Sequence, residues 1–259
     1  MNQQNGISLN KFISSTGFCS RREADKLIEA GSVTVNGQLP KLGNRVSDAD
    51  IIKIDGKPLK QKEKPIYIAF NKPIGVSSTT DRTDKYNIID YLHHPKRIFP
   101  IGRLDKPSEG LIFLTNDGDI VNKILRAGNN HEKEYIVTVN KPITPGFIQR
   151  MSNGIKILDT VTQKCFVKQE SKYVFKIILT QGLNRQIRRM CEALDYHVTK
   201  LVRIRIMNIT LAGIAPGKWR YLTQMEIDTI NKLVENSIKT KEASLIKNKS
   251  AIVNTKSRL

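Results

Sequence analysis

The stretch GRLDKPSEGLIFLTNDG, residues 102–118, joins a loop, a strand and a turn, and it decides how the middle of this chain folds. Its first part is rich in glycine, proline and charged side chains, which is typical of an irregular loop. Leu111–Thr115 follows as a short apolar run, and a run of this length between turn residues predicts a buried strand. Asn116-Asp117-Gly118 favours a turn, after which Asp119 can cap a helix over residues 119–126.

Asp105 is the carboxylate of most interest in this stretch. It lies on the loop beside Arg103 and Lys106, immediately before the predicted buried strand. Taken alone, a loop aspartate is more typical of a surface turn than of a catalytic site. Asp117 and Asp119 need no further role, because turn formation and helix capping account for them.

On both sides of this stretch, short strands and helices follow one another without the regular period of parallel βαβ units. Several strands alternate apolar and polar residues, as Phe175–Thr180 does, and this alternation favours antiparallel pairing. We therefore predict an α+β fold in which helices flank a mixed, mostly antiparallel sheet. The predicted strands are 66–71, 111–115, 134–139, 162–168, 174–180 and 198–206, and the predicted helices are 119–126, 145–151, 185–194 and 224–239.

The first 60 residues predict a separate small module of two helices and a hairpin. Ser8 precedes an amphipathic turn, and Ser20 with Glu23 forms a capping box before a second helix. Gly31 supplies a left-handed stop, and Asn36-Gly37 is a strong hairpin-turn signal. We expect this module at residues 1–60, a charged, proline-ended linker at 61–65, the main domain at 66–236 and a basic, disordered tail at 237–259.

Charge points to a polyanionic partner. The 259 residues carry 43 Lys plus Arg against 24 Asp plus Glu, a formal net charge of +19. Module, main domain and tail all carry more basic than acidic residues. A positive body favours nucleic acid as a partner, although a Lys-rich proteome would give the same balance.

Several function classes are disfavoured by what the sequence lacks. Its apolar runs of about five residues are far shorter than a membrane span, and no secretory signal is visible. Cys19, Cys165 and Cys191 have no CxxC spacing, so neither a disulfide scaffold nor a cysteine-rich zinc site is supported. No GxGxxG, phosphate-binding loop, HExxH or histidine cluster occurs. We expect a reduced, cytoplasmic protein with no membrane contact, no metal and no cofactor.

Residues 18–37, FCSRREADKLIEAGSVTVNG, resemble the small RNA-binding module first known from a protein of the small ribosomal particle, the S-four-type or alpha-L motif. The resemblance implies that a basic helical face lies on structured RNA. Arg21, Arg22 and Lys26 would form that face, because residues four apart share one side of a helix. A solvated helix face is the alternative for these three residues.

Three further segments occur together: KPIG at residues 72–75, the GRLD stretch with its TNDG end, and NRQIRRM at 184–190. This combination resembles the ribosomal RNA pseudouridine synthases, which comprise the small-subunit enzyme of type A together with the large-subunit enzymes of types B, E and F. The resemblance runs from Ser8 to Thr223. Residues 124–135 and 203–208 are most similar to the large-subunit type F members.

The resemblance implies roles for individual residues. Asp105 matches the essential nucleophile of the family, Tyr135 the tyrosine that lies against the target base, and Arg188 the arginine that pairs with the aspartate. Leu201 matches an apolar position of the pocket, and Arg103 would help to splay the RNA open. The remaining basic residues of the matching segments that we expect to bind RNA are Lys72, Arg185 and Arg189.

This chemistry suits the residues. Pseudouridylation breaks the glycosidic bond of uridine, turns the uracil over and rejoins it through carbon, so it needs neither a redox step nor a group carrier. A guanidinium beside Asp105 would favour the ionised carboxylate. Flipping a base out of folded RNA costs a few kcal/mol, which the basic stretch 185–205 could offset through phosphate contacts. Ser108 replaces the threonine of many members but keeps the hydroxyl, so we expect activity to be retained.

The residues leave alternatives open. A non-catalytic RNA-binding assembly factor would not need to keep Asp105, Tyr135 and Arg188 together. A glycoside hydrolase would need a second carboxylate, which the motifs do not offer. Within the synthase hypothesis, 23S (large-subunit) ribosomal RNA is the expected substrate, with small-subunit RNA or transfer RNA as the alternative. We expect a monomer.

Overall fold

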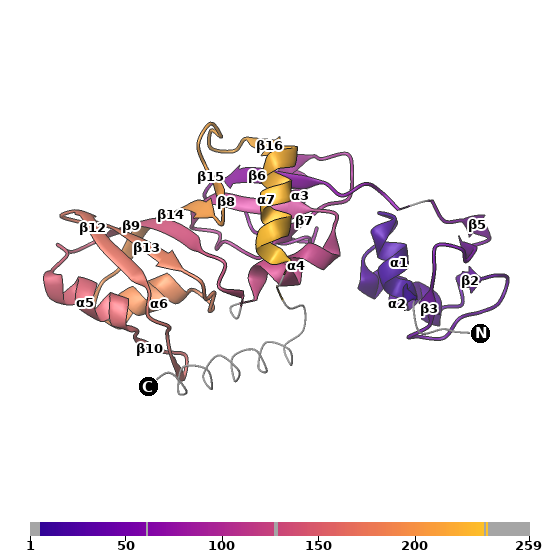
Figure 1. Ribbon diagram of the computed structural model, residues 1–259, viewed down its shortest axis with the longest axis horizontal. Coiled ribbons are helices and arrows are strands. Elements are labelled where there is room, and N and C mark those ends of the chain that lie inside the picture. The colour runs from indigo at the N-terminus through magenta and orange to yellow at the C-terminus, as the bar shows by residue number, and fades with distance from the viewer. Residues whose placement is uncertain (1–5, 61, 127–128, 236, 238–259) are drawn as a thin grey trace. The chain divides into compact units, whose positions relative to one another are not determined.

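The computed structural model describes residues 6–60, 62–126, 129–235 and 237 (Figure 1). Contacts within the chain divide it into two compact units, one of Met1–Ile66 with His94–Ile98 and the other of Tyr67–His93 with Phe99–Leu259. The return of His94–Ile98 to the first unit is not foreseen from the sequence. The predicted tail, apart from Ser237, lies outside the described residues. No helix in the described part of the chain is long and apolar enough to cross a bilayer.

The first unit consists of two helices and short strands. Buried side chains of both helices and of the strands form its core, among them Leu9, Ile28 and Ile54. The predicted capping box is present: Glu23 N donates to the Ser20 hydroxyl, and Ser20 N donates to the Glu23 carboxylate. The elements are β1 (Ile7–Ser8), α1 (Leu9–Ser15), α2 (Arg21–Glu29), β2 (Val33–Val35), β3 (Arg45–Val46), β4 (Ile52–Ile54) and β5 (Lys57–Pro58).

The turn at Asn36-Gly37 is present, but it does not join two neighbouring strands of a simple hairpin. Both residues have positive φ, 52° and 81°, as the sequence predicts. The strand before the turn, β2, pairs with β4, and the intervening residues form a loop that carries β3. The partner of a strand depends on which apolar face needs cover, and the local turn signal does not specify it.

The second unit is built on one nine-stranded sheet with the order β12-β13-β9-β14-β8-β6-β16, to which β7 and β15 add at β8 and β14. Neighbouring strands are antiparallel except for β14 and β8, which are parallel. The predicted mixed, mostly antiparallel sheet is therefore confirmed. The strands are β6 (Tyr67–Lys72), β7 (Phe99–Ile101), β8 (Glu109–Thr115), β9 (Lys133–Val139), β10 (Lys156–Ile157), β11 (Thr160–Val161), β12 (Phe166–Ser171), β13 (Val174–Leu179), β14 (Val198–Ile206), β15 (Ile209–Thr210) and β16 (Trp219–Tyr221).

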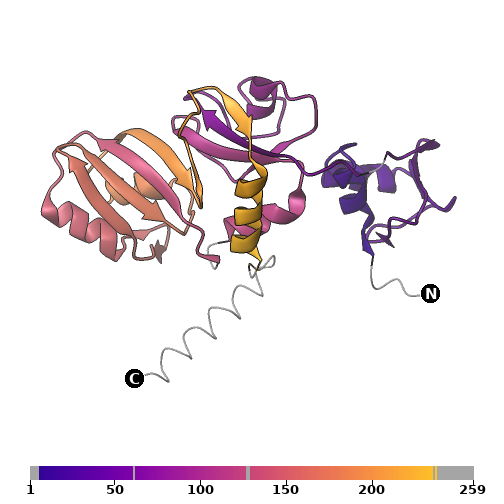
Figure 2. The same cartoon turned by 45° about the horizontal axis from the view of Figure 1, so that its top comes forward.

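Helices cover different parts of this sheet. Figures 1 and 2 show α5 and α6 along the part formed by β12, β13 and β9, whereas α4 and α7 lie against the part formed by β8 and β6. Apolar residues of α4 and α7, such as Ile124 and Ile230, pack in one core with Leu111 and Phe113 of β8. The helices are α3 (Ile88–Leu92), α4 (Gly118–Leu125), α5 (Pro145–Asn153), α6 (Gln186–Glu192) and α7 (Gln224–Val234).

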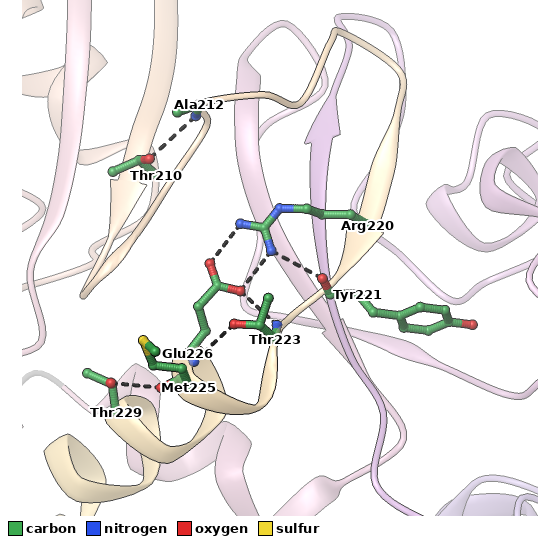
Figure 3. Close-up of polar contacts among 8 residues, drawn as sticks. All are labelled: Thr210, Ala212, Arg220, Tyr221, Thr223, Met225, Glu226 and Thr229. Atoms are coloured by element: carbon green, nitrogen blue, oxygen red, sulfur yellow. Dashed lines mark hydrogen bonds and ion pairs between the residues drawn. The ribbon is translucent and has the colours of Figure 1, made fainter.

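Helix α7 begins with a charged capping arrangement (Figure 3). Thr223 and Glu226 form a capping box, and both terminal nitrogens of Arg220 donate to the Glu226 carboxylate at 2.7 Å. These Arg220 hydrogen bonds are the main cause of a Glu226 pKa of about 2. The charged pair fixes the start of the helix that supports β8. Residues 236, 238 and 239 of the predicted helix lie outside the described residues.

Gly110 allows the two parallel strands to meet. It pairs with Arg203 in the register of β8 and β14, and its φ of 111° is one that residues with a side chain rarely adopt. A Cβ atom at Gly110 would lie 2.3 Å from the carbonyl oxygen of Arg203. No side chain fits there unless the two backbones separate.

We predict that Gly110→Ala destabilises the protein by at least about 2 kcal/mol, because it combines backbone strain with a backbone clash. Urea denaturation of the full chain measures this. Gly146→Ala is the matched control, since the nearest atom to its added Cβ is 3.9 Å away. Equal stability of the two variants would contradict the close approach of β8 and β14.

Candidate active site

Hydrogen bonds from Gly75 and Ser78 hold the loop that carries Asp105. Leu104 N donates to the Ser78 hydroxyl, which in turn donates to the Leu104 carbonyl at 2.8 Å. Gly75 N donates to the carbonyl of Lys106 on the other side of Asp105. The Asp105 side chain remains 37% exposed. The loop is therefore fixed at its backbone while its carboxylate stays accessible.

Two central strands present four side chains to one face of the sheet. Tyr135 of β9 lies opposite Arg203 of β14 in the antiparallel register. Lys133 and Leu201 lie two residues before Tyr135 and Arg203 respectively. Because alternate residues of a strand point to the same side, these four share one face. The Tyr135 phenol, the apolar Leu201 side chain and the cations of Lys133 and Arg203 therefore lie on the same side of the sheet.

The turn before α6 brings a basic side chain to Asp105. Arg185 adopts left-handed backbone angles, with φ 49° and ψ 35°, directly before the helix. Leu183 N donates to the Gln186 side chain, and the Arg189 guanidinium donates to both oxygens of Asn184. Hydrogen bonds with side chains of α6 thus stabilise the turn. Arg185 Nη1 lies 4.0 Å from Asp105 Oδ2.

These elements enclose a pocket of about 310 Å³. It brings together six predicted site residues: Arg103, Asp105, Tyr135, Arg185, Arg188 and Leu201. Lys72 and Arg189 do not line it. Arg21, Arg22 and Lys26 are exposed on α2 of the other unit. The remaining lining residues are Gly102, Leu104, Ser108, Leu125, Lys133, Leu179, Gln181, Gly182, Leu183, Asn184, Gln186, Ile187 and Arg203.

Arg188 makes hydrogen bonds to the backbone on two sides. Its Nη2 donates to the Pro107 carbonyl and the Ser108 hydroxyl, and its Nη1 donates to the Val198 carbonyl. The ion pair recorded for Asp105 within the described chain is with Arg185. Arg188 thus connects the Asp105 loop to β14, and burial lowers the pKa of Arg188, while the nearby Asp105 charge opposes this shift. The pairing of Arg188 with Asp105 stays a prediction.

Comparison with known proteins identifies the family to which this chain belongs. Residues 66–193 match the family model described as RNA pseudouridylate synthase, and residues 8–52 match the S4 domain. The chain is 57% identical to the dual-specificity RNA pseudouridine synthase RluF of Escherichia coli K12, over 89% of this chain and 80% of that protein. The chain belongs to the RNA pseudouridine synthase family.

Other relatives support the same membership. The ribosomal large subunit pseudouridine synthase B of Bacillus subtilis is 32% identical over 88% of this chain and 97% of its own. A crystal structure of a pseudouridylate synthase aligns with a TM-score of 0.63 at 28% identity, covering 86% of this chain and 99% of the other. This pseudouridine synthase is thus an isomerase whose fold joins an S4 domain to a catalytic sheet.

Lys72 is the predicted residue whose placement opposes its expected contact. It is fully buried, and its Nζ donates to the carbonyls of Pro73 and Val76. The expected contact with RNA is therefore wrong for this synthase, because no phosphate can reach the ammonium group. Burial, followed by the nearby positive charge of Arg203, lowers the pKa of Lys72 to about 8, while Asp105 opposes this shift. Lys72 fixes the turn beside the Asp105 loop and adds positive charge behind it.

Sequence reasoning missed two residues of the pocket, Lys133 and Arg203. Both are buried, at 7% and 6% exposure, in strands whose inward faces also carry the buried apolar residues Val137 and Leu201. The sequence did contain a signal for them: a charged residue stands at a position of an alternating strand that is expected to face the protein interior. In Leu201-Val-Arg203, for example, the inward positions read apolar and then basic. Among the residues with described placement, no group of three or more His, Cys, Asp or Glu could hold a metal ion.

We predict that stability rises between about pH 8 and 10.5 through Lys72. In this range the unfolded chain, with the ordinary pKa of 10.5, binds more protons than the folded chain, whose Lys72 has a pKa of about 8. The slope is at most about 1.4 kcal/mol per pH unit for one lysine. Urea denaturation from pH 7 to 10 should show the wild type gaining stability relative to Lys72→Met. Lys53→Met, at an exposed lysine, should run parallel to the wild type. Parallel curves for Lys72→Met and wild type would contradict the prediction.

Proposed function

We propose that this synthase isomerises a specific uridine of 23S ribosomal RNA, with Asp105 as its nucleophile. The observation that carries the proposal is that one pocket contains the Asp105 carboxylate, the Arg185 guanidinium 4.0 Å away, and the Tyr135 ring. The ionised carboxylate is the form needed to attack the sugar or to take a proton from it, and the Arg185 guanidinium lies within ion-pair distance of it. Tyr135 and Leu201 offer surfaces against which a detached uracil can be held.

Support for the substrate class comes from the relatives and from charge. The Bacillus subtilis relative is named for the large ribosomal subunit, whereas the Escherichia coli relative is named as dual-specificity. The second name favours a second RNA as the alternative substrate, either transfer RNA or small-subunit RNA. The net charge of +19 suits any of these polyanions. We expect the synthase to act as a monomer in the cytoplasm and to need no cofactor.

The roles of the basic residues follow from their exposure. Arg103 lines the mouth of the pocket, where it would hold the RNA open around the flipped nucleotide. Arg185 directly precedes α6, Arg189 lies in its last turn, and Arg188 positions the Asp105 loop. In the S4 unit, α2 exposes Arg21, Arg22 and Lys26, which would contact phosphates. We propose that residues 1–60 contribute affinity and that residues 66–236 contribute the chemistry.

We predict that Asp105→Asn lowers turnover by at least about a thousandfold, because the amide can neither attack nor accept a proton, while RNA affinity changes less than threefold. Tritium release from RNA labelled at C5 of uridine measures turnover. Pseudouridine mapping of ribosomal and transfer RNA, from cells lacking the gene and complemented with each variant, identifies the substrate.

Asp195→Asn is the matched control, since Asp195 is an exposed carboxylate outside the pocket. Its turnover should equal that of the wild type. Full turnover of Asp105→Asn would exclude Asp105 as the nucleophile. Loss of RNA binding together with turnover would instead make Asp105 a structural residue.

We also predict that replacing Arg22 and Lys26 by alanine weakens RNA binding without changing the rate at saturating RNA. Each lost phosphate contact reduces the slope of log affinity against log salt by about 0.7 to 0.9. Titrations at several salt concentrations measure the slope. Lys53→Ala, at an exposed lysine on β4, is the control. An unchanged salt slope in the double variant would contradict the assignment of this helix face to RNA.

A further inference from the structure

Arg203 is a buried cation in the wall of the active-site pocket. Its side chain is 6% exposed, and Nε donates to the Leu111 carbonyl at 2.6 Å. Nη2 is buried and has no hydrogen-bond acceptor among the residues that the structure describes. A guanidinium carries five donors, so most of its capacity is unused by neighbouring groups. Neither the predicted nucleophile nor the Asp105 loop uses this residue in any recorded hydrogen bond.

Lys133 is a second buried cation in the same wall. Its Nζ donates to the carbonyls of His131 and Thr180, at 2.9 and 3.3 Å. Burial, and then the charge of Arg203, lowers the pKa of Lys133 to about 8. Within the described chain, neither residue has a recorded ion pair with a carboxylate. Two positive side chains therefore face the pocket that contains Asp105, and neither of them forms an ion pair with a carboxylate of the described chain.

Such an arrangement is unfavourable in the absence of a ligand. Buried charges normally pair with opposite charges, and an unpaired one destabilises the folded state. A pocket that gathers them is therefore suited to negative charge on a bound molecule. Leu179, Ile187 and Leu201 add apolar surface to the same pocket, and such surface suits a planar base better than a phosphate group.

We propose that Arg203, with Lys133 beside it, contacts a carbonyl oxygen of the flipped uracil and stabilises negative charge on the base while it is detached from the sugar. This inference rests on the proposed function. When the C1′–N1 bond breaks, its electron pair stays on the uracil and spreads over the oxygens O2 and O4. C5 then bonds to C1′, the hydrogen on C5 leaves as a proton, and N1 gains a proton. Arg203 transfers no proton in this sequence.

The position of Arg203 supports this role. It lies directly opposite Tyr135 and two residues after Leu201, so it shares their face of the sheet. Its Nε hydrogen bond to β8 fixes the side chain before any substrate arrives. Donors that are already oriented need not reorganise when charge develops on the base, and this is the condition under which they accelerate a reaction most.

The test combines a substitution of Arg203 with the replacement of one uracil oxygen by sulfur in the RNA. Target RNAs carry uridine, 2-thiouridine or 4-thiouridine at the modified position, because sulfur accepts hydrogen bonds more weakly than oxygen. Single-turnover rates at saturating RNA are measured for the wild type and Arg203→Met. We expect Arg203→Met to lower the rate about a hundredfold while RNA affinity changes less than threefold. One of the two thio substitutions should slow the wild type and have no further effect in Arg203→Met.

Arg205→Met is the matched control. Arg205 lies on the same strand but pairs with Glu132 and Glu134, away from the pocket. Its thio penalties should equal those of the wild type. If Arg203→Met does not fold, Arg203→Lys supplies the comparison, with a smaller loss of rate and an altered thio penalty.

Equal thio penalties in the wild type and the Arg203 variants would overturn the inference and make Arg203 structural. A wild-type rate in Arg203→Met would also overturn it. Failure of the proposed function is a separate result, because Asp105→Asn would then keep its turnover. An essential Asp105 together with unaltered thio penalties would refute the role of Arg203 alone.

Discussion

The active site depends on the close approach of two parallel backbones at Gly110. Strand β8 follows the Asp105 loop, and β14 carries Leu201 and Arg203. Their pairing at Gly110 and Arg203 places the loop beside the strand that lines the pocket. Arg188 ties the same loop to the start of β14 through Pro107, Ser108 and Val198. The backbone contact at Gly110 and the Arg188 guanidinium thus set the position of the Asp105 carboxylate.

Positive charge surrounds that carboxylate. Arg185 lies at the surface of the pocket, whereas Lys72, Lys133 and Arg203 are buried around it. The lowered pKa values of the two lysines show that their charges are held at a cost to folding. Stability is given up for an environment suited to a polyanionic substrate and to a base that becomes negative. Exposed basic residues elsewhere add attraction without that cost.

Much of the fold could be predicted because its signals are local. The strand 198–206 is found with the predicted bounds, and the capping box of Ser20 and Glu23 forms as expected. The predicted strand at 162–168 instead begins at Phe166, and α3 and β7 were missed. Short elements carry too few residues for a period to show, and their form depends on the strands beside them. The return of His94–Ile98 to the first unit is likewise a contact between distant segments.

The sequence by itself determined the family, the α+β class and six of the residues that line the pocket, because motifs and alternation are properties of neighbouring residues. Only the tertiary structure decided what each cation touches. It placed Arg185 beside Asp105, buried Lys72, and brought Arg203 into the pocket. The contacts of a long basic side chain are set by which backbones enclose it, and residues far away in the chain supply those backbones.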